Sequence, residues 1–157
     1  MASQIITILG VLLGAVTSFA ATTLAERAKF RQGMATRWDE RKLETYVEYV
    51  ACVKEASRAA RRVLEARERD DDPAEALAEM EKLEARRSVL FEGLVLLAEE
   101  TAAEAAATAN ERLWALLRSA REPAGIPAPR RAELGSALVD ALNTLHKAAR
   151  ADLTIGG

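Results

Sequence analysis

The sequence predicts an all-α protein, in which one N-terminal membrane-spanning helix continues into a long antiparallel helical hairpin and a shorter third helix completes a three-helix bundle. Three observations support this prediction. The first 25 residues carry no charged side chain. Ala, Leu, Glu and Arg dominate the 157 residues and only 4% are aromatic, a composition typical of long helices or coiled coils. After residue 25, apolar residues recur at steps of three and four, the spacing of a helix face.

The membrane-spanning helix is predicted for residues 1–25, with its apolar stretch from Ile5 to Leu24. About twenty residues at 1.5 Å each span the hydrocarbon core of a bilayer. A cleavable signal peptide is the alternative, because the residues from Ser18 to Ala20 resemble a small-x-small cleavage site, and cleavage there would release a secreted helical domain. Secretory signals normally begin with a basic segment, and no Lys or Arg precedes Ile5. We therefore expect an anchor.

Basic residues beside the predicted span indicate its orientation. They follow the span and none precedes it, and basic flanks tend to stay in the cytoplasm. We therefore expect the cell membrane as the location, with the N-terminus outside and the body from Glu26 onward in the cytoplasm. The six cations either contact anionic lipid headgroups or only set the topology and solvate the helix. They are Arg27, Lys29, Arg31, Arg37, Arg41 and Lys42.

Small side chains recur every four residues within the predicted span and form a strip along one helix face. The strip consists of Gly10, Gly14, Ser18 and Thr22. Small-x-x-x-small strips let the backbones of membrane helices approach closely, so this face favours self-association or pairing with another membrane protein. Glycine is common in membrane helices, however, so the absence of any association remains an equal alternative.

The hairpin is predicted for residues 26–121, with its turn at about residues 70–73. Its first helix has no clear stop before Arg69, although Gly33 is a weak point. Asp72 is predicted to cap the second helix, Pro73 suits the first helical position, and Glu75 completes an arrangement like a capping box. An apolar seam on the first helix should face a partner helix. It comprises Leu43, Tyr46, Val50, Val53, Ser57, Ala60 and Leu64.

The second helix is predicted to continue unbroken to about Ser119 and to fold back against the first. Its seam contains one exception, Arg87, and an Ala-rich stretch from Thr101 to Thr108 permits close helix approach. Residues 26–69 hold 12 basic and 8 acidic groups, whereas residues 70–111 hold 3 basic and 12 acidic groups. We expect these opposite charges to lie side by side and to select the pairing of the two helices. The seam comprises Met80, Leu83, Leu90, Leu94, Leu97 and Thr101.

The remaining chain is predicted to form a Pro-rich linker at residues 122–129, a C-terminal amphipathic helix at residues 130–153 and a flexible tail at residues 154–157. Three prolines and a glycine prevent the linker from remaining helical. The C-terminal helix either packs against the hairpin, which we prefer, or serves as a binding element for another protein. Its apolar stripe comprises Leu134, Leu138, Leu142, Leu145 and Ala149.

The sequence contains no motif for catalysis, and we expect no cofactor and no metal. Cys52 and His146 are the only residues of their types, and they lie too far apart in sequence to suggest a zinc site. We expect Cys52 and Trp38 to pack in the core, and a cationic His146 to stabilise the carbonyl end of its helix. The net charge of −2 does not suggest nucleic-acid binding.

Five arginines crowd the membrane-distal end of the first helix. We expect them to be solvated partners of the acidic second helix, and a site for an anion or RNA is the alternative. They are Arg58, Arg61, Arg62, Arg67 and Arg69.

These observations favour a non-enzymatic, single-pass membrane scaffold or adaptor that acts through protein–protein contacts. Its expected partners are the lipid bilayer, a second copy or another membrane protein through the span, and a cytoplasmic protein. A second hypothesis is a membrane-acting effector that oligomerises through the span. A third is the secreted helical domain released by cleavage near Ala20, and a fourth is an enzyme whose site is completed by a partner chain.

Overall fold

The computed structural model describes residues 37–122 and 128–153, and it confirms the all-α prediction: those residues form helices joined by turns, without a strand. The first helix covers residues 37–68. It is followed by α2 (Ala74–Leu97), α3 (Glu100–Arg121) and α4 (Ala128–Leu153). The chain divides into two compact units, Met1–Glu40 and Arg41–Gly157, and the bundle described below belongs to the second unit.

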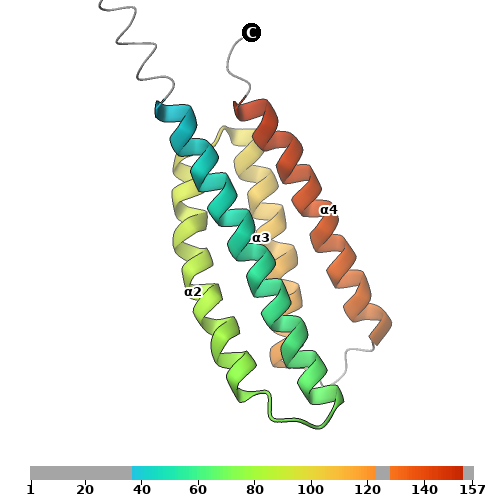
Figure 1. Cartoon of the computed structure of the whole chain (residues 1–157). Helices are drawn as coiled ribbons and strands as arrows, with labels where there is room; N and C mark the ends of the chain where they lie inside the picture. Colours follow the sequence, from blue (N-terminus) through green and yellow to red (C-terminus); the bar gives the residue numbers. More distant parts are fainter. Residues whose placement is uncertain (1–36, 123–127, 154–157) are drawn as a thin grey trace, which may run out of the picture. The chain divides into compact units, whose positions relative to one another are not determined.

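The helices of the second unit form an up-down-up-down bundle, in which each helix runs antiparallel to the one before it (Figure 1). Short connections between amphipathic helices favour this arrangement, because each helix can bury its apolar stripe only against a sequence neighbour that folds back. The C-terminal helix therefore packs against the other helices, as we preferred. The bundle has four helices in this part of the chain, however, where we expected three.

The additional helix arises because the predicted second helix is broken. Ala98 and Glu99 adopt extended backbone conformations, so α2 ends at Leu97 and α3 starts at Glu100. The Ala98 N–H still donates to the Leu94 carbonyl, and the Glu99 carbonyl accepts from Ala102 and Ala103, so helical hydrogen bonding continues up to the break on both sides. An unbroken helix would extend beyond the first helix and leave its Ala-rich half without a partner. The prediction of one helix up to Ser119 was wrong for this reason.

The predicted seams mostly form the core. Val53 and Ala60 on the first helix, Met80 on α2 and Leu145 on α4 have no exposed surface. Cys52 is also fully buried, as expected, and its Sγ lies 3.4 Å from the Leu83 carbonyl oxygen. Close packing of small side chains compensates for the scarcity of aromatic residues. The buried alanines of the Ala-rich stretch and its continuation are Ala102, Ala105, Ala106 and Ala109.

Three residues depart from the expected burial. Leu43, at the start of the first seam, is 51% exposed, and Trp38 is 53% exposed instead of lying in the core. Thr101, at the end of the second seam, is exposed because it lies beyond the break between α2 and α3. Thr101 lies just after the α2–α3 turn, and Leu43 follows Lys42, which is joined to that turn through Asp152.

The turn between the first helix and α2 contains a residue with a left-handed backbone conformation. Asp70 has a φ of 61°, the Asp70 N–H donates to Arg67, and the Asp71 N–H donates to Ala66. This pair of hydrogen bonds is a Schellman motif, in which the left-handed position usually holds glycine. The Asp72 carboxylate then accepts from the Ala74 N–H at 3.0 Å, immediately before α2. Asp72 thus accepts the first N–H of α2, the N-cap position is held by Pro73 without a side-chain cap hydrogen bond, and Glu75 lies in the first turn.

The predicted membrane span, Ile5–Leu24, lies outside the described residues. Among the helices of residues 37–122 and 128–153, none is long and apolar enough to cross a membrane. Most of the predicted linker and the C-terminal tail also lie outside the described residues, and α4 begins at Ala128, two residues before the expected start.

Candidate functional site

An open groove of about 580 Å³ lies between the first helix and α4. We call it the α4 groove. Leu43 and Val47 are 51% and 59% exposed, although both are large apolar residues near the buried seam. A contiguous exposed apolar surface of this kind is typical of a binding site for another molecule. The apolar floor comprises Leu43, Val47 and Val50 from the first helix and Leu145, Ala149 and Leu153 from α4.

Contacts join the two helices that form the walls of the groove. At the groove end near Leu43, Lys42 and Tyr46 contact Asp152 of α4. Farther along the two helices, beyond the residues that line the groove, Arg131 of α4 pairs with Glu68 of the first helix at 3.0 Å. The groove is therefore part of the bundle's geometry and requires no movement of a helix to form.

The charges along the groove are mostly positive. Lys54 and Arg58 of the first helix line the half that lies farther from Leu43, and Arg150 adds a positive charge from α4. The one acidic lining residue, Glu55, also pairs with Arg86 of α2 at 3.7 Å. The α4 groove therefore combines an apolar half with a cationic half, which suits an amphipathic helix that carries acidic residues.

His146 differs from our expectation because its environment disfavours the cation. Burial lowers the pKa of His146, and the positive charges of Lys54 and Arg150 lower it further. A histidine in this position is neutral at pH 7 and cannot act as the positive charge that we expected at the carbonyl end of α4. The correction follows from neighbours on two helices, which the sequence of α4 alone does not contain.

No protein-family model, curated protein or solved structure matches this chain. Its function is therefore inferred from its own residues and their contacts.

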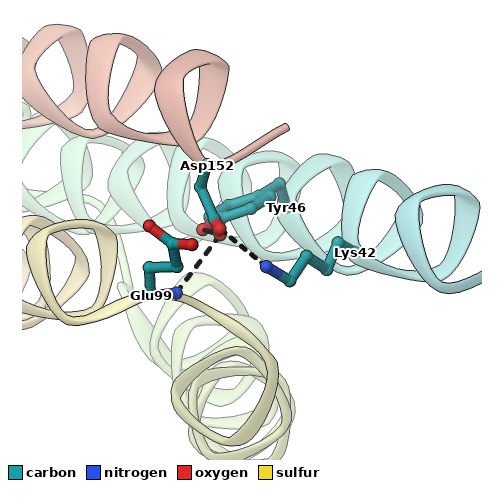
Figure 2. A network of polar contacts seen from close by, with 4 residues as sticks. All are labelled: Lys42, Tyr46, Glu99 and Asp152. Carbon is teal, nitrogen blue, oxygen red and sulfur yellow. Dashed lines mark hydrogen bonds and ion pairs between the residues drawn. The ribbon is translucent and has the colours of Figure 1, made fainter. Parts of the chain in front are cut away.

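A polar network lies at the groove end near Leu43, and Figure 2 shows its four residues, Lys42, Tyr46, Glu99 and Asp152. The Asp152 carboxylate accepts hydrogen bonds from the Lys42 ammonium at 2.6 Å, from the Tyr46 hydroxyl at 2.6 Å and from the Glu99 backbone N–H at 3.3 Å. The side chain of Asp152 is 1% exposed and that of Lys42 is 10% exposed. One buried carboxylate thus joins the first helix, α4 and the break between α2 and α3.

The electrostatics of this network indicate a structural role. Burial opposes ionisation of Asp152, but the hydrogen bonds from Lys42, Tyr46 and Glu99 outweigh it and lower the pKa of Asp152. Burial and the hydrogen bond to Asp152 raise the pKa of Tyr46 well above its ordinary value. The carboxylate therefore stays charged and the phenol stays protonated, and neither group exchanges a proton near neutral pH.

Arg87 forms a second buried polar site, on the inner face of α2. It is 3% exposed, it hydrogen-bonds the Asn110 side chain, and its guanidinium carbon lies 5.9 Å from the centre of the Trp114 ring. Its Nε is buried without a hydrogen-bond partner, and no carboxylate pairs with it among the described residues. Burial raises the pKa of the neighbouring Tyr49 to about 12, although the positive charge of Arg87 opposes this shift.

The predicted membrane-flanking cations differ in exposure and in their partners. Arg37 is exposed, and Arg41 is exposed and pairs with Glu44 at 3.0 Å. Lys42 is buried against Asp152, so the lipid contact that we considered for the six cations does not extend to it. The other three cations and the strip of small residues lie outside the described residues, namely Arg27, Lys29 and Arg31 and Gly10, Gly14, Ser18 and Thr22.

The arginines near the end of the first helix do not pair with α2 as expected. Arg67 donates to the backbone carbonyls of Ala120 at 2.6 Å and Arg121 at 3.2 Å, and therefore caps the C-terminal end of α3. Arg69 pairs with Asp71 at 3.2 Å, and Arg58 lines the α4 groove. The ion pair that joins the first helix to α2 in the described chain, Glu55 with Arg86, reverses the expected signs.

Sequence reasoning missed both the α4 groove and the Asp152 network. The network did leave a signal: Asp152 continues the α4 stripe three residues after Ala149, and Lys42 precedes Tyr46 by one helical turn. Charged residues that extend two apolar stripes at opposite chain ends are candidates for a buried pair. The groove left a weaker signal, because Val47 lies beside the seam and not on it. Among the described residues, no cluster of three or more His, Cys, Asp or Glu side chains could hold a metal ion.

Proposed function

We propose that this chain is a non-enzymatic membrane scaffold or adaptor, in which the segment from Ile5 to Leu24 holds the protein at the cell membrane and the bundle binds a protein in the α4 groove. The observation that carries this proposal is the exposed apolar floor of the groove, in which Leu43 and Val47 are more than half exposed. Exposed apolar area of this kind is costly in water and is compensated when a partner covers it.

Three further features support the proposal. The groove is already open in the bundle, and the contacts of Asp152 with Lys42 and Tyr46 join its two walls near Leu43. The titratable groups at its end are committed to structural contacts, since Asp152 is held by three donors. An uncharged N-terminal stretch long enough to span a bilayer precedes the bundle in the sequence, which favours an anchored binding module.

Membrane attachment is tested by fractionating cells that express the full chain with a C-terminal tag. We expect the protein to pellet with membranes and to resist alkaline extraction, and we expect deletion of residues 5–24 to release it. Full release of the intact chain by alkaline buffer, or a mature chain that begins after Ala20, would overturn the anchor.

Binding through the groove is tested with two matched variants of the full chain in mild detergent. Val47→Asp introduces a charge into the groove floor, whereas Val139→Asp introduces the same charge at a valine of α4 that is 50% exposed and lies outside this groove. We expect Val47→Asp, and not Val139→Asp, to reduce the mass of the complexes measured by light scattering. A wild-type chain that remains monomeric and retains no protein partner would contradict the adaptor function.

A further inference from the structure

The outer face of α2 carries a second exposed surface, which we call the α2 ridge. It comprises Glu81, Ala85, Val89, Glu92 and Leu96, which are all exposed and lie opposite the buried side of the helix. Val89 is 73% exposed and Leu96 is 83% exposed, so the ridge presents two large apolar residues to solvent. Its remaining members are two carboxylates and one small residue. The ridge is therefore an acidic amphipathic helix face that the described part of the bundle leaves uncovered.

We propose that the α2 ridge of a second copy of this chain docks in the α4 groove. This inference rests on the role of the groove as a binding site in the proposed function and names its occupant. The charge pattern supports a second copy: the ridge is acidic with two apolar anchors, and the groove has an apolar half and a cationic half. The acidic groups of the ridge complement the cations of the groove, and every copy of the chain carries both surfaces.

The spacing of the two surfaces agrees when the ridge runs antiparallel to the first helix. Leu43 and Arg58 are separated by the same number of residues as Leu96 and Glu81. A helix that places Leu96 over Leu43 therefore places Glu81 at Arg58, about 22 Å along the groove. The same register brings the two apolar anchors of the ridge over the apolar floor. The two apolar anchors thus meet Leu43 and Val50, opposite charges meet at Arg58, and the carboxylate of Glu92 falls between the two anchors.

The middle of this register is also compatible with close approach. Lys54 falls opposite Ala85, whose small side chain leaves room for the lysine to reach along the ridge. Glu92 falls over Val47. Substitution of Val47 or Glu92 leaves the expected contact between Arg58 and Glu81 in place. A crosslink between positions 47 and 92 can therefore report the register.

The geometry of this contact predicts a specific type of assembly. The ridge and the groove are different surfaces of one chain, so the contact is head-to-tail and leaves one free ridge and one free groove in every row of copies. Attachment to a membrane raises the local concentration of copies and favours such rows. The scaffold therefore extends itself by adding copies, and its mass increases with protein concentration.

The docking is tested by disulfide crosslinking between two differently tagged full-length copies in a Cys52→Ala background. One copy carries Val47→Cys and the other carries Glu92→Cys, so a disulfide between the two tags reports the proposed register. We expect this crosslink to form on mild oxidation. A copy with Val139→Cys, outside the α4 groove, is the control and should give at least tenfold less crosslink with the Glu92→Cys copy.

Charge reversal provides a second readout in the same experiment. Arg58→Glu in the groove copy should reduce the crosslink at least tenfold, and Glu81→Arg in the ridge copy should restore it. Arg62→Glu, an exposed position of the same helix that does not line the groove, should leave the crosslink unchanged. Rescue by the second reversal excludes misfolding as the cause of the first loss.

The outcomes separate this inference from the proposed function. A Val47→Cys disulfide to a different protein, with no crosslink to Glu92→Cys, overturns docking by a second copy. In the case of a different protein, the adaptor function remains supported. If the crosslink forms and survives Gly10→Leu and Gly14→Leu, but the chain does not fractionate with membranes, docking is supported and the anchor is overturned.

Discussion

The hydroxyl of Tyr46 donates a hydrogen bond of 2.6 Å to Asp152, and this contact joins the first helix to the last turn of α4 across more than 100 residues of sequence. The same carboxylate binds Lys42 and the backbone N–H of Glu99. Asp152 thus determines three features together: the closed end of the α4 groove, the position of α4 and the turn between α2 and α3.

Removal of the Asp152 carboxylate should therefore be costly. Asp152→Ala leaves the Lys42 ammonium buried without its partner, and breaking a buried pair in this way typically costs about 3–5 kcal/mol. We expect a loss of this size in the free energy of unfolding, measured by helical circular dichroism of the full chain in detergent during denaturation. Glu44→Ala, which breaks the exposed pair with Arg41, is the control and should cost less than about 1 kcal/mol. Equal losses in the two variants would contradict a buried network.

The lowered pKa of Asp152 predicts how this contribution depends on pH. A carboxyl group whose pKa is lower in the folded chain stabilises the fold above its unfolded pKa of about 3.9, and that stability is lost as the pH falls through the folded value. The difference in unfolding free energy between wild type and Asp152→Asn should therefore be constant from about pH 5 to pH 8 and shrink below about pH 4. A difference that grows on acidification would have the wrong sign.

His146 should make the folding stability depend on pH in a higher range than Asp152 does. Its pKa is lowered by burial and by the nearby cations Lys54 and Arg150, so the unfolded chain binds a proton more readily than the folded chain. Stability should therefore decrease as the pH falls below the unfolded pKa of about 6.5. We expect wild type to lose stability relative to His146→Gln between about pH 7.5 and pH 5.5, as measured by thermal unfolding of the full chain. Because this is the only histidine, no second imidazole complicates the comparison.

The sequence was informative about the helices because their apolar spacing is local. Val53, Ala60 and Leu145 lie on predicted stripes and are fully buried. The break after Leu97 was not predictable in the same way, since residues 94–109 mostly favour helix and contain neither proline nor glycine. Packing of α3 against the other helices and the hydrogen bond to Asp152 override that local preference.

The charges and the groove were less predictable because they depend on which helices become neighbours. The count of charges along the chain suggested a basic first helix against an acidic second helix. In the ion pair between them, however, the first helix supplies the acid, Glu55, and α2 supplies the base, Arg86. Lys42 belongs to a run of cations that we expected either to contact lipid headgroups or to be solvated, and it is buried because α4 brings Asp152 to it. The α4 groove likewise exists only once α4 has packed beside the first helix.

Arg87 provides a test of whether a buried charge stabilises this fold. It hydrogen-bonds Asn110 and lies over Trp114, but its Nε is unsatisfied and it lacks a carboxylate partner in the described part of the chain. Replacement of a poorly compensated buried charge by an apolar residue of similar volume is often neutral or stabilising, so Arg87→Met should change the unfolding free energy by less than about 1 kcal/mol or increase it.

Asn110→Leu is the matched variant, because it leaves the Arg87 guanidinium buried without its amide partner. We expect it to cost about 1–3 kcal/mol, the penalty of an unsatisfied buried polar group. Both values are measured by chemical denaturation of the full chain. If Arg87→Met were the more damaging change, Arg87 would contribute net stability through Trp114 and Asn110, and this interpretation would fail.

Asp70 offers the opposite opportunity, a substitution that should stabilise the protein. Its φ of 61° places it in the left-handed region, which costs residues with a side chain about 1 kcal/mol and glycine almost nothing. Asp70→Gly keeps the backbone hydrogen bonds of the Schellman motif, because the N–H of residue 70 still reaches Arg67 and that of Asp71 still reaches Ala66. We expect a gain of about 0.5–1 kcal/mol in the free energy of unfolding.

The neighbouring position supplies the control for this prediction. Asp71 does not have a positive φ, so Asp71→Gly adds flexibility to the unfolded chain without relieving any strain and also removes the ion pair with Arg69. It should lower the thermal unfolding midpoint of the full chain, whereas Asp70→Gly should raise it. The same direction of change in both variants would show that the left-handed backbone at Asp70 stores no appreciable strain, because aspartate tolerates that conformation through its own polar contacts.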